Sequence, residues 1–301
     1  MIQATKKVIF IVGPTAIGKT KLSIRIAKKF KTEIISCDSR QFYKELKIGA
    51  APPSTKELKD IKHHFIHQLS VEQDYNAGKF ELEAIKKIED IHKKNNTIII
   101  VGGSGLYVNA ICKGFDKMPD IARSIREKLA IKYKKNGLTW LQKKVESIEP
   151  EFYQNYDTKN PKRLLRALEL FEQTGKKPSE FRSQKIKKRP FEIIKIGLKI
   201  DRDELYSRIN KRVDIMIANG LFNEAETLIN FKHNNALKTV GYTEIFDFLN
   251  HHYSYEETIE EIKKNTRRFA KRQITWFNQD KDITWFHPNQ NSEIEDFILR
   301  S

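Results

Sequence analysis

The chain has 301 residues, enough for one large domain with an insertion or for two modest domains. Hydrophobic residues make up 39% and charged residues 32%, and no apolar run is long enough to cross a bilayer or to form an N-terminal leader. We therefore expect a soluble, cytoplasmic protein, and its length does not require a dimer, so we expect a monomer. Cys37 and Cys112 stand alone, a pattern that indicates neither a disulfide framework nor a zinc module.

The net charge of +17 indicates a polyanionic partner, for which nucleic acid is the leading candidate. A solvated surface rich in lysine would give the same excess. The basic residues are clustered, however, and one cluster contains Arg182, Lys185, Lys187, Lys188 and Arg189. A second cluster runs from Lys263 to Arg272, with six basic residues and no acidic one.

The first 115 residues alternate strand-like and helix-like patterns, as a parallel α/β unit does. A β-branched run over residues 8–12 predicts a strand buried on both faces. Apolar residues at every fourth position from Thr20 predict a helix after it. We predict a second strand over 33–37, a helix over 80–91 and a third strand over 97–101.

After Gly114 the pattern changes to helical spacing with many charges and few β-branched runs. We therefore predict that residues 116–189 form a mostly helical insertion domain, whereas residues 1–115 and 190–301 form the α/β core with C-terminal helices. A last strand is predicted over 193–200. Helices are predicted after it from Asp203, Leu221 and Tyr255.

A phosphate-binding motif follows the first predicted strand and precedes the first predicted helix. The pattern G-x-x-x-x-G-K-[ST] is matched by Gly13, Pro14, Thr15, Ala16, Ile17, Gly18, Lys19 and Thr20. Backbone N–H groups of such a loop point at phosphate oxygens, the lysine adds a positive charge, and the final hydroxyl can bind Mg²⁺. A glycine-rich turn without a ligand is the alternative. The motif and its context predict a P-loop NTPase-like parallel sheet that binds a diphosphate or triphosphate.

The strand predicted over 97–101 ends in Gly102, Gly103 and Ser104, with no acidic residue. An ordinary P-loop NTPase has an aspartate at such a strand end to hold Mg²⁺. The sequence therefore disfavours ATP hydrolysis. Asp38 instead follows the second predicted strand, at the edge where an open α/β sheet binds its ligands. The alternative interpretation of Asp38 is a helix N-cap.

Six segments in this order resemble the tRNA dimethylallyltransferases, also called tRNA isopentenyltransferases, and the resemblance runs from Val8 to Phe286. The segments are the P-loop and residues 36–43, 101–107, 161–169, 240–242 and 270–277. The resemblance implies an enzyme of the bacterial type. Such an enzyme transfers a dimethylallyl group from dimethylallyl diphosphate to the exocyclic amine of the adenine 3′ to the tRNA anticodon, with Mg²⁺ as cofactor.

The resemblance also implies roles for single residues. Asp38 would be the general base, Ser104 would bind the bridging oxygen of the donor, and Arg212 rather than Arg208 would contact the diphosphate. Thr20 and Asp38 would hold Mg²⁺. The family has a threonine where this chain has Ser104, which keeps the hydroxyl but loses the methyl group that restricts its rotamer.

The residues implied in tRNA binding fall in several segments: Asp38, Ser39, Arg40, Gln41, Arg126, Lys162, Arg163, Leu164, Leu165, Arg166, Val240, Gly241, Tyr242, Lys271, Arg272, Gln273 and Trp276. Basic residues at helical spacing beside Phe269 and Trp276 independently favour binding to an RNA loop. A helix with core aromatic residues and exposed basic residues would show the same sequence pattern. The chain departs from the family at residues 49–53, at Lys162 and at Thr243, which puts local tRNA contacts in question.

Two other functions remain open from the sequence. A nucleoside or nucleotide kinase shares the P-loop but leaves the basic segments unexplained, and a non-catalytic RNA-binding protein would not need the complete loop. The spacing of His63, His64 and His67 could hold a metal. Because no acidic or cysteine partner lies nearby in the sequence, we interpret these histidines as strand or loop residues.

Overall fold

The computed structural model describes the chain except residues 1–4, 117, 155, 156 and 182–185. The chain divides into two compact units, one formed by residues 1–113 and 188–301 and the other by residues 114–187. Arg182 and Lys185 of the first basic cluster lie outside the described residues. Within the described parts, no helix has both the length and the apolar character needed to span a membrane.

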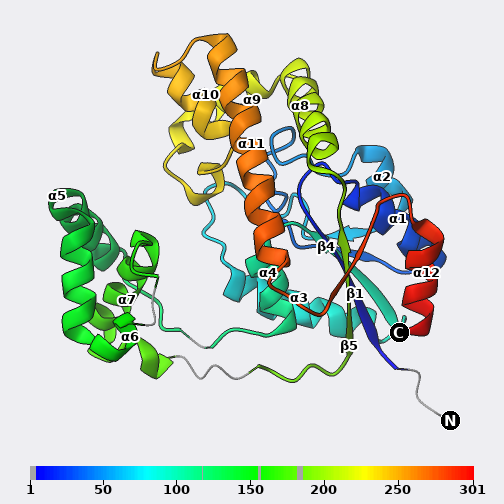
Figure 1. Cartoon of the computed structure of the whole chain (residues 1–301), viewed down its shortest axis with the longest axis horizontal. Helices are drawn as coiled ribbons and strands as arrows, with labels where there is room; N and C mark the ends of the chain where they lie inside the picture. Colours follow the sequence, from blue (N-terminus) through cyan, green and yellow to red (C-terminus); the bar gives the residue numbers. More distant parts are fainter. Residues whose placement is uncertain (1–4, 117, 155–156, 182–185) are drawn as a thin grey trace. The chain divides into compact units, whose positions relative to one another are not determined.

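The larger unit is built on a six-stranded parallel sheet with the order β3-β2-β4-β1-β5-β6 (Figure 1). The strands are β1 (Lys7–Val12), β2 (Ile34–Ser36), β3 (His63–His64), β4 (Thr97–Gly102), β5 (Glu192–Leu198) and β6 (Ile283–Phe286). All pairings between neighbouring strands are parallel. The predicted parallel α/β sheet is confirmed.

Neighbouring residues of the central strands point into two different apolar clusters, because side chains alternate across a sheet. Phe10 and Ile100 pack with residues of α3 (Ala77–Ile91) and α4 (Gly105–Cys112). Ile9 and Ile99 pack with residues of α1 (Lys19–Lys29) and α12 (Asn291–Arg300). Helices therefore cover both faces of the sheet, which explains the uninterrupted β-branched runs in the sequence.

The remaining helices of this unit are α2 (Thr55–Asp60), α8 (Arg202–Ala218), α9 (Leu221–Thr227), η2 (Ile229–Phe231), η3 (Asn235–Leu237), α10 (Tyr242–Leu249) and α11 (Tyr255–Phe277). The longest of them, α11, begins with a capping box between Ser254 and Glu257. It contacts α8, and its C-terminal end reaches α4 (Figure 1). This path brings α11 to the end of β4.

The smaller unit contains α5 (Arg123–Ile148), α6 (Pro150–Gln154), α7 (Pro161–Thr174) and η1 (Pro178–Phe181). Gly137 interrupts α5 with a φ of 72°, a conformation that glycine adopts without steric cost. Leu129, Leu141 and Leu164 form the core between α5 and α7. The described residues of this unit are thus mainly helical, as the sequence predicts.

The structure corrects two details of the sequence analysis. The strand predicted over 193–200 is β5, but it is not the last strand, because β6 follows α11 and pairs with it. The Arg189 side chain is only 9% exposed, so it is largely inaccessible to a polyanion. It donates hydrogen bonds to the carbonyls of Ala110 and Ile111 at the end of α4 and forms an ion pair with Glu81.

Candidate active site

A pocket of about 910 Å³ opens at the carboxyl ends of β1, β2 and β4. Its wall combines the P-loop, residues 36–41, residues 101–107 and side chains from α8 and α11. These segments are far apart in the sequence. The parallel pairing of β1, β4 and β2 brings the first three of them to one edge of the sheet.

The P-loop crosses from β1 to α1 with its lysine at the helix start. Gly13 and Gly18 have φ angles of 142° and 103°, which side chains rarely adopt, and a Cβ on Gly13 would lie 2.9 Å from the Leu198 carbonyl oxygen. The Lys19 ammonium donates to the carbonyls of Gly13 and Pro14 at 3.0 and 2.7 Å. Burial lowers the pKa of Lys19 to about 8, although the Asp38 carboxylate opposes this shift. The ammonium therefore remains mostly protonated at pH 7.

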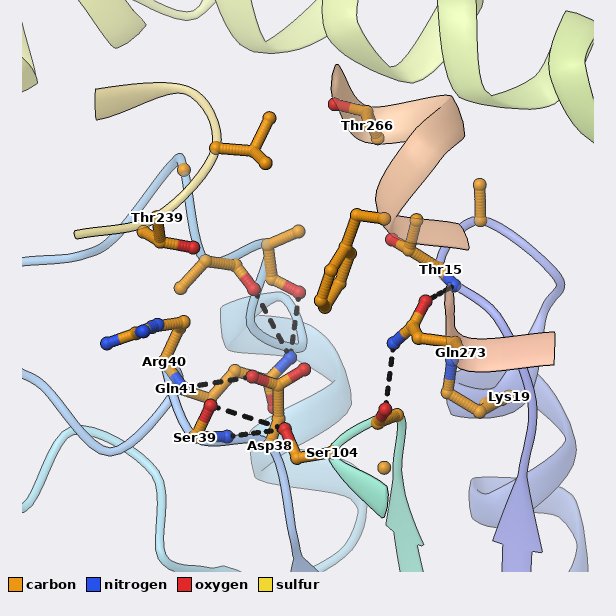
Figure 2. Close-up of a pocket in the computed structure, with 18 of the residues that line it drawn as sticks. Thr15, Lys19, Asp38, Ser39, Arg40, Gln41, Ser104, Thr239, Thr266 and Gln273 are labelled. Atoms are coloured by element: carbon orange, nitrogen blue, oxygen red, sulfur yellow. Dashed lines mark hydrogen bonds between the residues drawn. The ribbon is translucent and has the colours of Figure 1, made fainter. Parts of the chain in front are cut away.

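Asp38 and Ser104 follow the ends of neighbouring strands, and Ser104 is hydrogen-bonded to Ser39, the residue after Asp38 (Figure 2). The Asp38 carboxylate accepts the Arg40 N–H at 3.0 Å. The Ser39 N–H donates to the Ser104 hydroxyl oxygen at 3.1 Å, and the Ser104 hydroxyl lies 3.3 Å from that of Ser39. A carboxylate and a hydroxyl are thus held on the same wall of the pocket.

Arg208 and Arg212 both line the pocket, but their guanidinium groups have different partners. The Arg212 guanidinium donates to the Ala51 carbonyl at 3.4 Å, and burial lowers its pKa while Asp38 raises it. Arg208 instead forms an ion pair with Glu204 one turn earlier on α8, at 2.7 Å. Lys19, Arg40, Arg208 and Arg212 are half-buried cations in the pocket wall, and Asp38 is the carboxylate among the described lining residues.

Three residues expected at the RNA surface have buried side chains. Leu164 lies in the core of the smaller unit, and the Tyr242 hydroxyl donates to the Glu224 carboxylate at 2.6 Å. Gln273 is hydrogen-bonded within the pocket wall. Because these side chains are enclosed by protein, a contact with RNA at these positions would have to involve the main chain.

Two further residues of the expected RNA contact organise loops around the pocket. The Arg40 guanidinium donates to the carbonyls of Asn235 and Ala236 at 2.6 and 3.1 Å. The Gln41 side chain donates to the carbonyl of Ala51 at 3.1 Å and accepts from the Ser36 hydroxyl at 3.0 Å. Both side chains therefore have protein partners.

Exposed residues of α11 at and beside the pocket match the expectation of a basic surface with aromatic rings. Lys271 and Arg272 are exposed, and the Arg272 guanidinium lies 5.7 Å from the centre of the Phe269 ring. Phe269 and Trp276 remain 38% and 41% exposed. Such rings and charges can stack on bases and pair with phosphates. Arg126, Lys162, Arg163, Leu165 and Arg166 all belong to the smaller unit, with Arg166 paired to Glu169.

Glu224 supports the site but has no recognisable signal in the sequence. Its carboxylate accepts the main-chain N–H groups of Lys47, Ile48 and Gly49 at 2.8 to 3.1 Å, in addition to the Tyr242 hydroxyl. A Cβ on Gly49 would lie 2.6 Å from the Tyr242 ring. Glu224 thus fixes the loop whose continuation, at Ala51, accepts a hydrogen bond from Arg212.

The three histidines do not form a metal site. His63 and His64 form β3, and the His64 ring nitrogen Nε2 lies 2.5 Å from the Glu33 carboxylate. Burial lowers the pKa of all three imidazoles. Among the described residues, no group of three or more His, Cys, Asp or Glu side chains is placed to hold a metal ion.

Comparison with known proteins gives a consistent result. A family model described as IPP transferase matches residues 41–280. A tRNA dimethylallyltransferase of Christiangramia forsetii is 51% identical over 289 residues, which cover 96% of each chain. The crystal structure of a full-length tRNA isopentenylpyrophosphate transferase from Bacillus halodurans has a TM-score of 0.73 and 34% identity, covering 98% of this chain and 96% of that one.

A eukaryotic dimethylallyltransferase, whose structures are described as snapshots of the enzyme acting on tRNA, has a TM-score of 0.81 and 29% identity. The alignment covers 98% of this chain and 80% of that chain. The fold is therefore shared by bacterial and eukaryotic proteins, and it is the P-loop NTPase-like α/β fold that the sequence predicts.

The different surroundings of Arg212 and Arg208 predict different effects on anion binding. We expect Arg212→Met to weaken the binding of inorganic diphosphate by about tenfold to a hundredfold, because a hydrogen bond to a charged group is lost from a buried site. Arg208→Met, the matched change one turn earlier on α8, should alter the Kd by less than about twofold. Isothermal titration calorimetry measures both constants, and equal losses in the two variants would contradict the assignment to Arg212.

Proposed function

The chain belongs to the IPP transferase family, and we propose that this transferase moves a dimethylallyl group from dimethylallyl diphosphate to the exocyclic amine of the adenine 3′ to the tRNA anticodon. The observation that supports this most strongly is the combination of a complete P-loop with Asp38 and Ser104 at the neighbouring strand ends of one pocket. The end of β4 has no acid. The nucleoside or nucleotide kinase considered from the sequence is therefore not favoured.

The proposed reaction is a single displacement. The adenine amine attacks the allylic carbon, the bond between that carbon and the bridging oxygen breaks, and the bonding electrons leave with diphosphate. Asp38 accepts the proton that the amine loses. Ser104 binds the bridging oxygen, while the loop amides, Lys19 and Arg212 stabilise the negative charge that develops on the diphosphate.

The pocket also fits Mg²⁺, which we propose as the cofactor. The Thr20 hydroxyl and the Asp38 carboxylate both line the pocket, and both are oxygen ligands of the kind that Mg²⁺ takes. Mg²⁺ commonly uses one or two protein ligands and completes its shell with phosphate oxygens and water. When bound, it would neutralise part of the charge on the leaving diphosphate.

We propose that tRNA binds along the exposed face of α11, through Lys271, Arg272 and the ring of Trp276. The target base lies in a polynucleotide and must leave its stack to enter a pocket of about 910 Å³. Further contacts from the smaller unit would hold the anticodon arm. A monomer in the cytoplasm, where tRNA is processed, is sufficient for this reaction.

The identity of the released product tests the proposed function directly. We expect inorganic diphosphate to appear only when tRNA and dimethylallyl diphosphate are both present, and Lys19→Ala to abolish its release because the loop loses its charge. A coupled diphosphate assay and mass analysis of the tRNA nucleosides measure the two products. Steady formation of ADP from ATP with a nucleoside acceptor, without diphosphate from the allylic donor, would instead establish a kinase.

The role of Asp38 is tested by Asp38→Asn, which keeps the shape of the side chain but cannot accept the proton. We expect the chemical step to slow by about a hundredfold to ten-thousandfold. Single-turnover kinetics with saturating tRNA measure the step. A rate near that of the original chain would remove Asp38 from the mechanism.

The proposed RNA surface of α11 is tested by the salt dependence of binding. Lys271→Ala should weaken tRNA binding and reduce the slope of log K against log salt by about 0.7 to 0.9, because one phosphate contact is lost. Lys86→Ala on α3 is the matched control, since Lys86 is exposed and does not line the pocket. Identical slopes for both variants would place the RNA elsewhere.

A further inference from the structure

Gln273 connects α11 to the P-loop through both ends of its side-chain amide. Its oxygen accepts the Thr15 N–H at 2.9 Å, and its nitrogen donates to the Gly103 carbonyl at 2.9 Å. Figure 2 shows the side chain extending from α11 between the P-loop and the end of β4. Gln273 is only 6% exposed, yet it forms part of the pocket wall.

Glycines on the facing turn allow this close approach of α11. A Cβ on Gly103 would lie 2.2 Å from the Gln273 amide nitrogen, and one on Gly105 would lie 2.1 Å from the Trp276 ring. The space beneath α11 is therefore too small for a side chain at Gly103 or Gly105. Two hydrogen bonds and tight packing hold the Gln273 amide in one orientation, with its oxygen towards the loop.

The hydrogen bond to Thr15 removes one donor from the phosphate cradle. A P-loop binds phosphoryl groups mainly through its main-chain N–H groups, so each additional phosphoryl group needs additional donors. Thr15 lies in the first half of the loop, whereas Lys19 and Thr20 lie at the start of α1. The amide oxygen of Gln273 accepts the Thr15 N–H that a phosphate oxygen could otherwise accept. Its partial negative charge would also repel a further phosphate at this position.

We propose that Gln273 is a specificity-determining residue that limits the P-loop to a diphosphate and excludes the third phosphoryl group of a triphosphate. This inference rests on the proposed use of the loop for a leaving diphosphate. The absence of an acid after β4 disfavours the catalysis of phosphoryl transfer. Gln273, in contrast, would decide which polyphosphate can bind.

The test compares inorganic diphosphate with inorganic triphosphate, each titrated into the full chain without RNA and at one Mg²⁺ concentration. The original chain should bind diphosphate at least about tenfold more tightly, since one hydrogen bond to a charged group contributes about that factor. In Gln273→Ala the Thr15 N–H is released, and we expect this preference to fall by about tenfold. The ratio of the two Kd values is the readout, because a general loss of structure would weaken both ligands.

Two further variants complete the experiment. Gln279→Ala makes the same chemical change at an exposed position beyond the end of α11 and should leave the ratio unchanged. Gln273→Met keeps the side-chain volume while removing the acceptor, so it should also lower the preference if the alanine variant does not fold. Equal Kd values for the two ligands in the original chain, or an unchanged ratio in a folded Gln273 variant, would overturn the proposal.

These outcomes are independent of the transfer reaction. Failure to modify tRNA with a preserved preference for diphosphate would count against the proposed function and leave the role of Gln273 intact. Full transfer activity in a chain that binds triphosphate as tightly as diphosphate would count against Gln273 alone. The two proposals therefore fail in different assays.

Discussion

Parallel pairing of β1, β4 and β2 is the constraint on which the site depends. Because the three strands run in one direction, the P-loop, Asp38 and Ser104 all follow carboxyl ends at a single edge of the sheet. Helices on both faces bury these strands, and the buried hydrogen-bonded ladders limit their movement. The reactive groups thus stand on a rigid platform, as a site that must orient two substrates requires.

The charges in the pocket are arranged for an anionic ligand. Lys19 and Arg212 are both desolvated, and burial lowers the pKa of each, which shows that their charge is held at a cost in free energy. Asp38 offsets part of this cost. A bound diphosphate would offset more of it. Desolvation thus makes the charges of the empty pocket costly, and it also strengthens their attraction for an anionic ligand.

Helix α11 contributes both to the pocket wall and to the exposed basic surface beside it. Gln273 is hydrogen-bonded to the P-loop, whereas Lys271 and Arg272 are exposed, and Arg272 also lines the pocket. The helix packs closely on the turn after β4 because Gly103 and Gly105 have no side chains; a Cβ at either position would collide with α11. One rigid helix therefore contributes to the donor site and to the exposed basic surface.

Much of the fold and part of the site could be predicted from the sequence, because both depend on local patterns. The β-branched runs gave the central strands, and the glycine, lysine and threonine spacing gave the P-loop with its chemistry. The short strand β6 was not found, and β3 was left open between strand and loop, since two or four residues show no period and acquire their identity only by pairing with β2 and β5. The choice of Arg212 over Arg208 came from resemblance, whereas the structure supplies a physical ground in burial and in the Glu204 pair.

Burial and long-range hydrogen bonding were decided by the tertiary structure alone. The local sequence does not predict that Gln273 is buried beside the exposed Lys271 and Arg272, or that the Arg189 side chain is largely buried although it belongs to a basic cluster. Which side of a helix or linker faces the interior depends on segments far away in the chain. The bond from Gln273 to Thr15 spans 258 residues, and that from Arg189 to Ile111 spans 78. A local pattern can specify a helix or a loop, but a contact between distant residues exists only once the sheet has brought them together.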